Sequence, residues 1–136
     1  MDEYMSSPRV WGLSCPGCPE EISRARRWVS EILRETPCAD DAALIVSELS
    51  TNALRHTASS DGGGTFLVTV TVCPDTLTVA VTDGGTKLHS PEAQQAGADA
   101  THGRGLDIVH VLAHQVAITG DHLGRTVTAV LQIPAQ

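Results

Sequence analysis

The sequence predicts an α+β fold, a two-layer α/β sandwich with helices on one face of a mostly antiparallel sheet. Two segments in the first half of the chain repeat apolar residues at helical spacing. The next two segments, 65–73 and 76–82, alternate apolar residues with threonine and are joined by a short Pro-Asp turn, which is typical of an antiparallel hairpin. Two more alternating segments, 116–119 and 125–133, follow near the C-terminus. Elements in this order pack as two layers.

Length and composition indicate one globular unit. The chain has 136 residues and no repeat or linker, so we expect a single domain over residues 1–136. With 41% hydrophobic and 18% charged residues it has a globular balance, and a net charge of −7 disfavours nucleic acid as a partner. No apolar run is long enough to cross a membrane, and residues 1–4 lack the basic start of a signal peptide. We therefore expect a cytoplasmic protein that binds a small ligand or another protein.

The N-terminal segment, residues 1–18, is expected to lead into the domain through a short strand at 9–13 and a turn. The first helix then begins at Pro19 and Glu20 and is stopped by Pro37. Its apolar side faces the core, and its arginine-rich side is either an ordinary solvated surface or a docking surface for an acidic partner. The apolar residues are Ile22, Ala25, Val29, Ile32 and Leu33, and the arginines are Arg24, Arg27 and Arg34.

Four cysteines occur, and two of them, Cys15 and Cys18, have a Cys-x-x-Cys spacing. Structural disulfides are disfavoured in a reducing compartment, and no second pair follows at the distance typical of a zinc site. Two interpretations stay open for this pair: a loop without chemistry, and a redox or partial metal site.

The second helix, expected over 39–57, carries a polar stripe. Glu48, Asn52 and His56 follow one another at intervals of four residues, so their side chains lie along one side of the helix. The neighbours that flank the stripe are apolar, namely Leu44, Ile45, Leu49 and Ala53. The pattern predicts that Glu48 and Asn52 point into a pocket with apolar walls, where a carboxylate needs a water or a cation as partner. The alternative is a helix end that happens to carry two polar residues.

Asp83 follows the second strand of the hairpin. Counting by twos from Leu77 through Val79 and Val81 places its side chain on the core face. An unpaired carboxylate is costly there, so we expect Asp83 to meet a buried donor. The exocyclic amine of a purine is one candidate, and a backbone N–H of the turn that begins at Gly84 is the other.

The segment 84–102 is too long for an ordinary connection, and we interpret it as a lid. It leads into a third helix that opens with Gly103, Arg104, Gly105 and Leu106. A helix N-terminus offers free N–H groups and the positive end of the helix dipole, and glycines let phosphate oxygens approach the backbone. The motif is neither a Walker loop nor a dinucleotide fingerprint, because no Gly-Lys-Ser/Thr follows and Ile108 stands where a third glycine would be.

Four sequence blocks, taken in order, resemble the nucleotide-binding boxes of the GHKL ATPases. They are ELSTNALRH at 48–56, VTDGG at 81–85, HGRGLDIV at 102–109 and GRTV at 124–127. Within that superfamily the chain is similar to the anti-sigma-factor serine kinases, because a helix ending in ARRWVSEIL precedes LIVSELSTNALRH. The resemblance covers the chain from about Pro19 onward. It implies the Bergerat ATP-binding fold, with 84–102 as the ATP lid.

The resemblance also implies roles for individual residues. Asn52 would ligate the Mg²⁺ that bridges the ATP phosphates, and Glu48 would be the catalytic base for a seryl hydroxyl. Asp83 would bind the adenine amine with support from Thr126, and His56 would shape the pocket. Lys87 stands where the family's second box has its last glycine, which implies either a stiffer lid that holds the nucleotide differently or a side chain that reaches a phosphate. The other expected nucleotide contacts are Gly85, Gly103, Arg104, Gly105 and Leu106.

The implied function is a protein serine kinase with ATP and Mg²⁺ as cofactors. It would transfer the γ-phosphate to a serine of an anti-anti-sigma antagonist and otherwise sequester a sigma factor, with a homodimer as its expected assembly. The alternative is a nucleotide-gated regulator that binds a partner without catalysis. The catalytic lobe of a sensor histidine kinase is disfavoured because the sequence shows no helix with a phospho-acceptor histidine. A zinc or redox module would depend on Cys15 and Cys18 alone.

Overall fold

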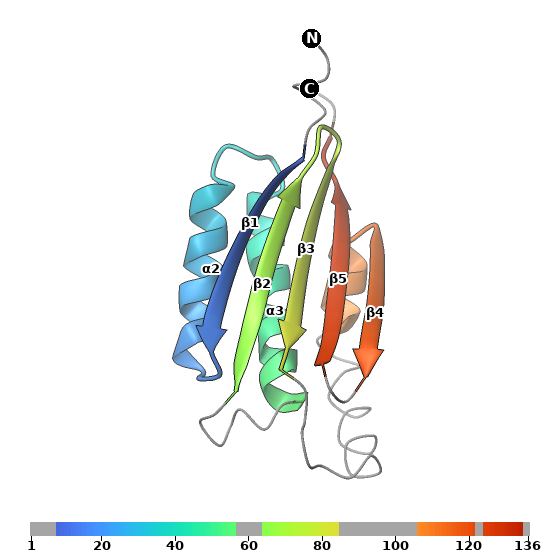
Figure 1. Cartoon of the computed structure of the whole chain (residues 1–136). Helices are drawn as coiled ribbons and strands as arrows, with labels where there is room; N and C mark the ends of the chain where they lie inside the picture. Colours follow the sequence, from blue (N-terminus) through green and yellow to red (C-terminus); the bar gives the residue numbers. More distant parts are fainter. Residues whose placement is uncertain (1–7, 57–63, 85–105, 122–123, 135–136) are drawn as a thin grey trace.

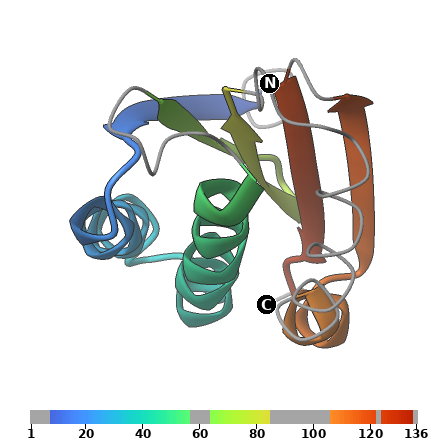
Figure 2. The ribbon, with the colours of Figure 1, turned by 90° about the horizontal axis from the view of Figure 1, so that it is seen from below.

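The computed structural model shows a five-stranded sheet with helices on one face (Figures 1 and 2). It describes residues 8–56, 64–84, 106–121 and 124–134. The elements are β1 (Arg9–Pro16), α2 (Glu20–Ile32), α3 (Ala39–His56), β2 (Thr65–Val72), β3 (Thr76–Asp83), a helix over 106–112, β4 (Gln115–Asp121) and β5 (Gly124–Gln132). The predicted α+β sandwich is therefore correct.

The strand order is β1-β2-β3-β5-β4, and every neighbouring pair is antiparallel. The hairpin of β2 and β3 is closed by a hydrogen bond from the Cys73 N–H to the Thr76 carbonyl at 2.9 Å. β3 then pairs on its other side with β5, which comes much later in the chain. As a result, the end of β3 and the start of β5 lie side by side at one end of the sheet (Figure 1).

The core lies between the sheet and the helices. Burial alternates along β2 and β3 as predicted, with Phe66, Val68, Val70 and Val72 buried on the first strand. α3 packs against β2 and β3, and α2 packs against α3 and β1. The helix over 106–112 adds Val109, which is fully buried. Each such side chain contributes roughly 1.5–3 kcal/mol through its removal from water.

Two element boundaries differ from the prediction. β1 extends from Arg9 to Pro16 instead of ending at 13, because the pairing with β2 continues to the end of the strand. α2 ends at Ile32, before Pro37 is reached. The chain leaves the helix through tighter turns, in which the Thr36 N–H donates to the Leu33 carbonyl at 2.7 Å. Pro37 lacks the N–H that would bond to the Leu33 carbonyl, so it prevents the helix from continuing through it but does not fix where the last full turn ends.

Gly120 requires glycine. Its φ is +96°, which L side chains rarely adopt, and an added Cβ would collide with the backbone of Gly124. We expect Gly120→Ala to lower the free energy of unfolding by about 1–3 kcal/mol, measured by urea denaturation. Gly12→Ala is the matched control, because an added Cβ there meets only the Val68 carbonyl oxygen at 3.9 Å. Equal stability of the two variants would show that the Gly120 backbone is not constrained.

Candidate functional site

Buried polar side chains gather at the end of the molecule where β3 ends. Within the described residues, the buried polar or charged ones are Ser50, Asn52 and Asp83. Asn52 comes from the C-terminal half of α3, and Asp83 is the last residue of β3. α3 packs on β3, and Figure 1 shows its C-terminal half beside the end of that strand. Both side chains therefore enter the layer between helices and sheet at the same end.

On α3, Asn52 is 7% exposed and Glu48, one turn earlier, is half-buried. The flanking residues Ile45, Leu49 and Ala53 are buried, so the pair lies along an apolar wall as the spacing predicts. The Asn52 Nδ2 atom has no hydrogen-bond partner within the described part of the chain. Because an unsatisfied buried amide costs about 1–3 kcal/mol, a group of this kind is usually completed by a ligand or water.

Asp83 lies on the helix-facing side of the sheet and is 6% exposed. Its Oδ1 accepts a hydrogen bond from the backbone N–H of Arg125 at 3.2 Å. As the hydrogen-bond donor to Asp83, the sequence predicts either a purine amine or an N–H of the turn at Gly84. The protein donor instead belongs to the adjacent strand β5, which the hairpin pattern of β2 and β3 does not reveal.

Arg125 is a site residue that the sequence analysis missed. β3 and β5 pair through Thr82 and Thr126, so Arg125 stands opposite Asp83, one position further along. Burial lowers the pKa of the Arg125 guanidinium from its ordinary value, and the Asp83 carboxylate acts in the opposite direction. The sequence does contain a signal for it. Val127, Ala129 and Leu131 alternate on the inward face of β5, and counting back two residues from Val127 reaches Arg125.

Thr126 lies on the opposite face of the sheet from Asp83. Its Oγ1 is 2.7 Å from the Oγ1 of Thr82, its cross-strand partner. Successive residues of a strand point to opposite faces, so Thr82 and Thr126 share the face turned away from Asp83 and the helices. Arg125 is the β5 residue opposite Asp83 on the helix-facing side, and a part for Thr126 in a contact made by Asp83 stays a prediction.

The remaining predicted contacts are only partly described. Leu106 begins the described part of the helix over 106–112, where it packs against the core. The other predicted residues lie outside the described residues: Gly85, Lys87, Gly103, Arg104 and Gly105. The proposed lid at 84–102 lies outside them too, apart from Gly84, and so does the side chain of His56.

Comparison with known proteins identifies the family. The family model for the histidine kinase-like ATPase domain matches residues 15–131. The chain belongs to this family. Among solved structures, it resembles the RsbU and RsbW domains of Rv1364c from Mycobacterium tuberculosis, with a TM-score of 0.69 and 18% identity. That match covers 94% of this chain but only 34% of the other, and it shows a shared fold. No curated protein matched the sequence.

Histidine kinase-like ATPase domains of the GHKL type bind ATP, usually with Mg²⁺. The donor set at this site fits such a ligand. The Asn52 amide offers an oxygen, which is a hard ligand of the kind Mg²⁺ takes, and its nitrogen is unsatisfied within the described residues. Asp83, at the end of β3, offers a buried hydrogen-bond acceptor. The candidate site therefore contains one side chain suited to a metal ion and one suited to the amine of a nucleobase.

The cysteines do not form a second centre in the described structure. All four are free thiols, with Cys15 buried on the core face of β1 and Cys18 exposed. Burial is the main cause that raises the pKa of the Cys15 thiol, so the reactive thiolate is disfavoured there. Among the described residues, no group of three or more His, Cys, Asp or Glu side chains could hold a metal ion. Across the same residues, no helix has the length and apolar character needed to span a membrane.

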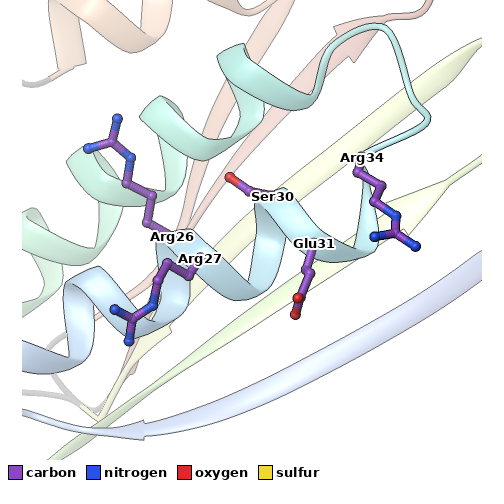
Figure 3. A pocket seen from close by; sticks show the side chains of 5 residues that line it. All are labelled: Arg26, Arg27, Ser30, Glu31 and Arg34. Atoms are coloured by element: carbon purple, nitrogen blue, oxygen red, sulfur yellow. The ribbon is translucent and has the colours of Figure 1, made fainter.

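A second feature is a shallow groove on the outer surface of α2 (Figure 3). It is lined by four exposed residues of this helix, Arg26, Arg27, Ser30 and Glu31, and by the exposed Arg34 of the turn that follows it. The sequence analysis grouped Arg24 with Arg27 and Arg34. In the structure the Arg24 guanidinium instead donates to the Glu21 carboxylate at 2.5 Å, and Arg26 joins the groove. We call these three arginines, Arg26, Arg27 and Arg34, the α2 arginine groove.

Proposed function

We propose that this chain acts as a protein serine kinase of the anti-sigma type. It uses ATP and Mg²⁺ to phosphorylate a serine of an anti-anti-sigma antagonist, and otherwise it sequesters a sigma factor. The carrying observation is the pair on α3: a buried Asn52 whose Nδ2 atom has no hydrogen-bond partner within the described residues, and a half-buried Glu48 one turn away. The family match and the fold shared with an RsbW-containing protein support the same proposal.

Each residue has a chemical task in this proposal. The Asn52 amide oxygen holds the metal that comes with the nucleotide, and Asp83 accepts a hydrogen bond from the amine of the adenine ring. The hydroxyl oxygen of the substrate serine bonds to the γ-phosphorus, and Glu48 accepts the proton that this hydroxyl loses. In the same step the bond from the γ-phosphorus to the β,γ-bridging oxygen breaks. Bound ATP supplies the phosphoryl group and, with its metal, the charge neutralisation. The remaining proposed nucleotide contacts are Gly85, Lys87, Gly103, Arg104, Gly105 and Leu106.

The proposal is tested first by thermal unfolding with and without Mg-ATP. A ligand at 100 times its dissociation constant adds about 2.7 kcal/mol, which raises the melting temperature by roughly ten degrees in a domain of this size. Asn52→Ala should lose this shift yet be as stable as the wild type without nucleotide, because the Nδ2 atom that it removes has no hydrogen-bond partner among the described residues. Asp83→Asn should also lose most of the shift.

Leu77→Ala serves as the control for these variants. It should lower stability by about 2–5 kcal/mol but keep the nucleotide-induced increase in the free energy of unfolding, since Leu77 is buried at the start of β3, at the opposite end of that strand from Asp83. If the wild type shows no shift at millimolar Mg-ATP, the nucleotide site is rejected.

Glu48→Gln separates a kinase from a nucleotide-gated regulator without catalysis. The variant keeps a polar side chain of the same size but cannot accept a proton as a carboxylate does. We expect a normal thermal shift with Mg-ATP and a loss of about 10²–10⁴-fold in phosphate transfer from labelled ATP to the antagonist protein. Transfer at the wild-type rate would exclude Glu48 as the base, and the absence of transfer by the wild type itself would favour the regulator.

For the protein partner we propose docking at the α2 arginine groove. The net charge of the chain is −7, yet Arg26, Arg27 and Arg34 make no ion pair within the described residues, which leaves them available to an acidic partner segment. Arg27→Glu combined with Arg26→Glu should weaken binding of the sigma factor or antagonist by about tenfold or more, measured by titration calorimetry, because each change replaces attraction by repulsion. Arg55→Glu, an exposed change on α3, is the control. Unchanged partner affinity in the double variant would exclude this surface.

A further inference from the structure

The free edge of β1 presents backbone groups that the sheet does not use. β1 lies at the end of the sheet and pairs with β2 on one side only. In an antiparallel pair, every second residue bonds to the partner strand, and the residues between turn their N–H and C=O groups the other way. The Gly17 N–H donates to the Gly64 carbonyl at 2.9 Å in the same register, so the odd-numbered residues bond to β2. The even-numbered Val10, Gly12 and Ser14 therefore point these groups to the free edge, where no described residue bonds to them.

This edge lacks the features that protect edge strands in most sheets. Such strands are commonly short, interrupted by a bulge, or guarded by lysine or an internal proline. β1 is eight residues long, pairs with β2 without interruption and contains no lysine. Its proline, Pro16, stands at one end. Its charged residue, Arg9, stands at the other end, with the guanidinium 5.5 Å from the centre of the Trp11 ring. The middle of the strand is therefore open to a further strand.

The helix layer extends further than the sheet on this side. α3 packs against β2 and β3, whereas α2 packs chiefly against β1 among the strands, at the margin of the molecule (Figure 2). An α-helix is about 10 Å wide and neighbouring strands are about 4.8 Å apart, so one helix covers about two strands. α2 thus covers β1 and the position of one further strand beyond its free edge.

The side chains around this position are apolar and only half-buried. On β1 they are Trp11 and Leu13, which share the helix-facing side with the fully buried Cys15. On α2 the half-buried side chain is Trp28, one turn after Arg24. The Arg24 charge reaches Cys15, because burial raises the pKa of that thiol and Arg24 lowers it to a lesser extent. An added strand with apolar side chains toward α2 would remove more of both tryptophans from water.

The charges at the two ends of the edge are opposite. Arg9 is exposed where β1 begins, and Glu20 is exposed just beyond its end, in the first turn of α2. A segment antiparallel to β1 matches both charges when it begins with a basic residue and ends with an acidic one. Between its ends β1 carries no charge, so the middle of a matching segment is uncharged as well.

We propose that the free edge of β1 takes up an extended segment of a partner protein as an added antiparallel strand. The segment has apolar side chains at alternate positions facing α2, a basic residue at its beginning and an acidic residue at its end. Main-chain hydrogen bonds to Val10, Gly12 and Ser14 supply affinity, and the tryptophans select the apolar side chains. This surface goes beyond the proposed kinase activity and does not depend on the proposed nucleotide site.

A second copy of this chain does not fit the same edge. Pairing of two β1 strands would bring both copies of α2 to one place. Helices pack with their axes about 8–10 Å apart, whereas the two β1 strands would lie about 4.8 Å apart. A single extended segment has no helix of its own to accommodate.

The test uses the end-blocked peptide Lys-Val-Thr-Val-Thr-Val-Thr-Glu as the probe and measures amide hydrogen exchange of the full chain by NMR. Without the probe, the N–H groups of Gly12 and Ser14 should exchange faster than those of Trp11 and Leu13, which bond to β2. With the probe, exchange at Gly12 and Ser14 should slow by about tenfold or more, and tryptophan fluorescence should shift to shorter wavelength. Slow exchange at both residues without the probe, or no change at millimolar probe, overturns the inference.

N-methylated forms of the probe test the strand pairing without any protein variant. In the proposed register the threonines of the probe stand opposite the even-numbered residues of β1 and donate to them, whereas the N–H groups of the valines point away. N-methylation of the threonines should weaken binding by about tenfold or more, and N-methylation of the valines should not. Equal effects of the two modifications overturn the inference.

Gly12→Pro removes one N–H from the free edge and keeps the bonds to β2, since proline is tolerated where the N–H of an edge strand faces solvent. It should weaken the probe by about tenfold or more. Gly12→Ala, which keeps the N–H and has room for a Cβ, should bind as the wild type does. Equal affinities of the two variants count against the added strand. Protection of Gly12 and Ser14 that rises with protein concentration, without the probe, would make a second copy the occupant and also overturn the proposal.

Discussion

The pairing of β3 with β5 is the interaction on which the site depends. It joins two strands that are distant in sequence and makes one continuous sheet out of the three strands β1, β2 and β3 and the hairpin of β4 and β5. It also brings the end of β3 against the start of β5, where Asp83 accepts the backbone N–H of Arg125. On the other face, the bond between the Thr82 and Thr126 hydroxyls ties the same two strands together. One register therefore supports both the sheet and the Asp83 side of the candidate site.

The other side of the candidate site comes from α3, and this helix has to satisfy two requirements at once. Its apolar side covers the sheet with Ile45, Leu49 and Ala53, while Asn52 enters the same layer as a buried polar group. A polar residue at this depth lowers stability unless it is paired. Its presence beside a half-buried Glu48 is the local conflict expected where selection acts for binding instead of stability.

The family match establishes a histidine kinase-like ATPase domain. In the described structure, two separate regions carry the candidate functional residues. Asn52 on α3 and Asp83 at the end of β3, the residues proposed to bind nucleotide, lie in the layer between the helices and the sheet. The α2 arginine groove lies on an exposed helix surface and contains no residue of that site. A chain with a separate ligand layer and a separate charged surface can couple nucleotide binding to a protein partner, because the two do not compete for the same side chains.

The sequence by itself determined the elements and their buried faces. Alternation of apolar residues identified β2 and β3, helical spacing identified α2 and α3, and both patterns placed Asn52 and Asp83 on inward faces. These are local properties, since the direction of a side chain follows from the residues on either side of it. The same patterns exposed the conflict between burial and polarity that marks the candidate site.

Only the tertiary structure decided which residues meet. The register of β3 on β5 put Arg125 opposite Asp83 and turned Thr126 to the other face. On α2, Arg24 pairs with Glu21 and does not line the groove, whereas Arg26 lines it. Register between distant strands is set by the packing of the whole sheet, and a partner among several acidic neighbours is set by side-chain geometry. Neither is encoded in the periodicity of a single segment, because a period fixes a face and not the residue that lies across from it.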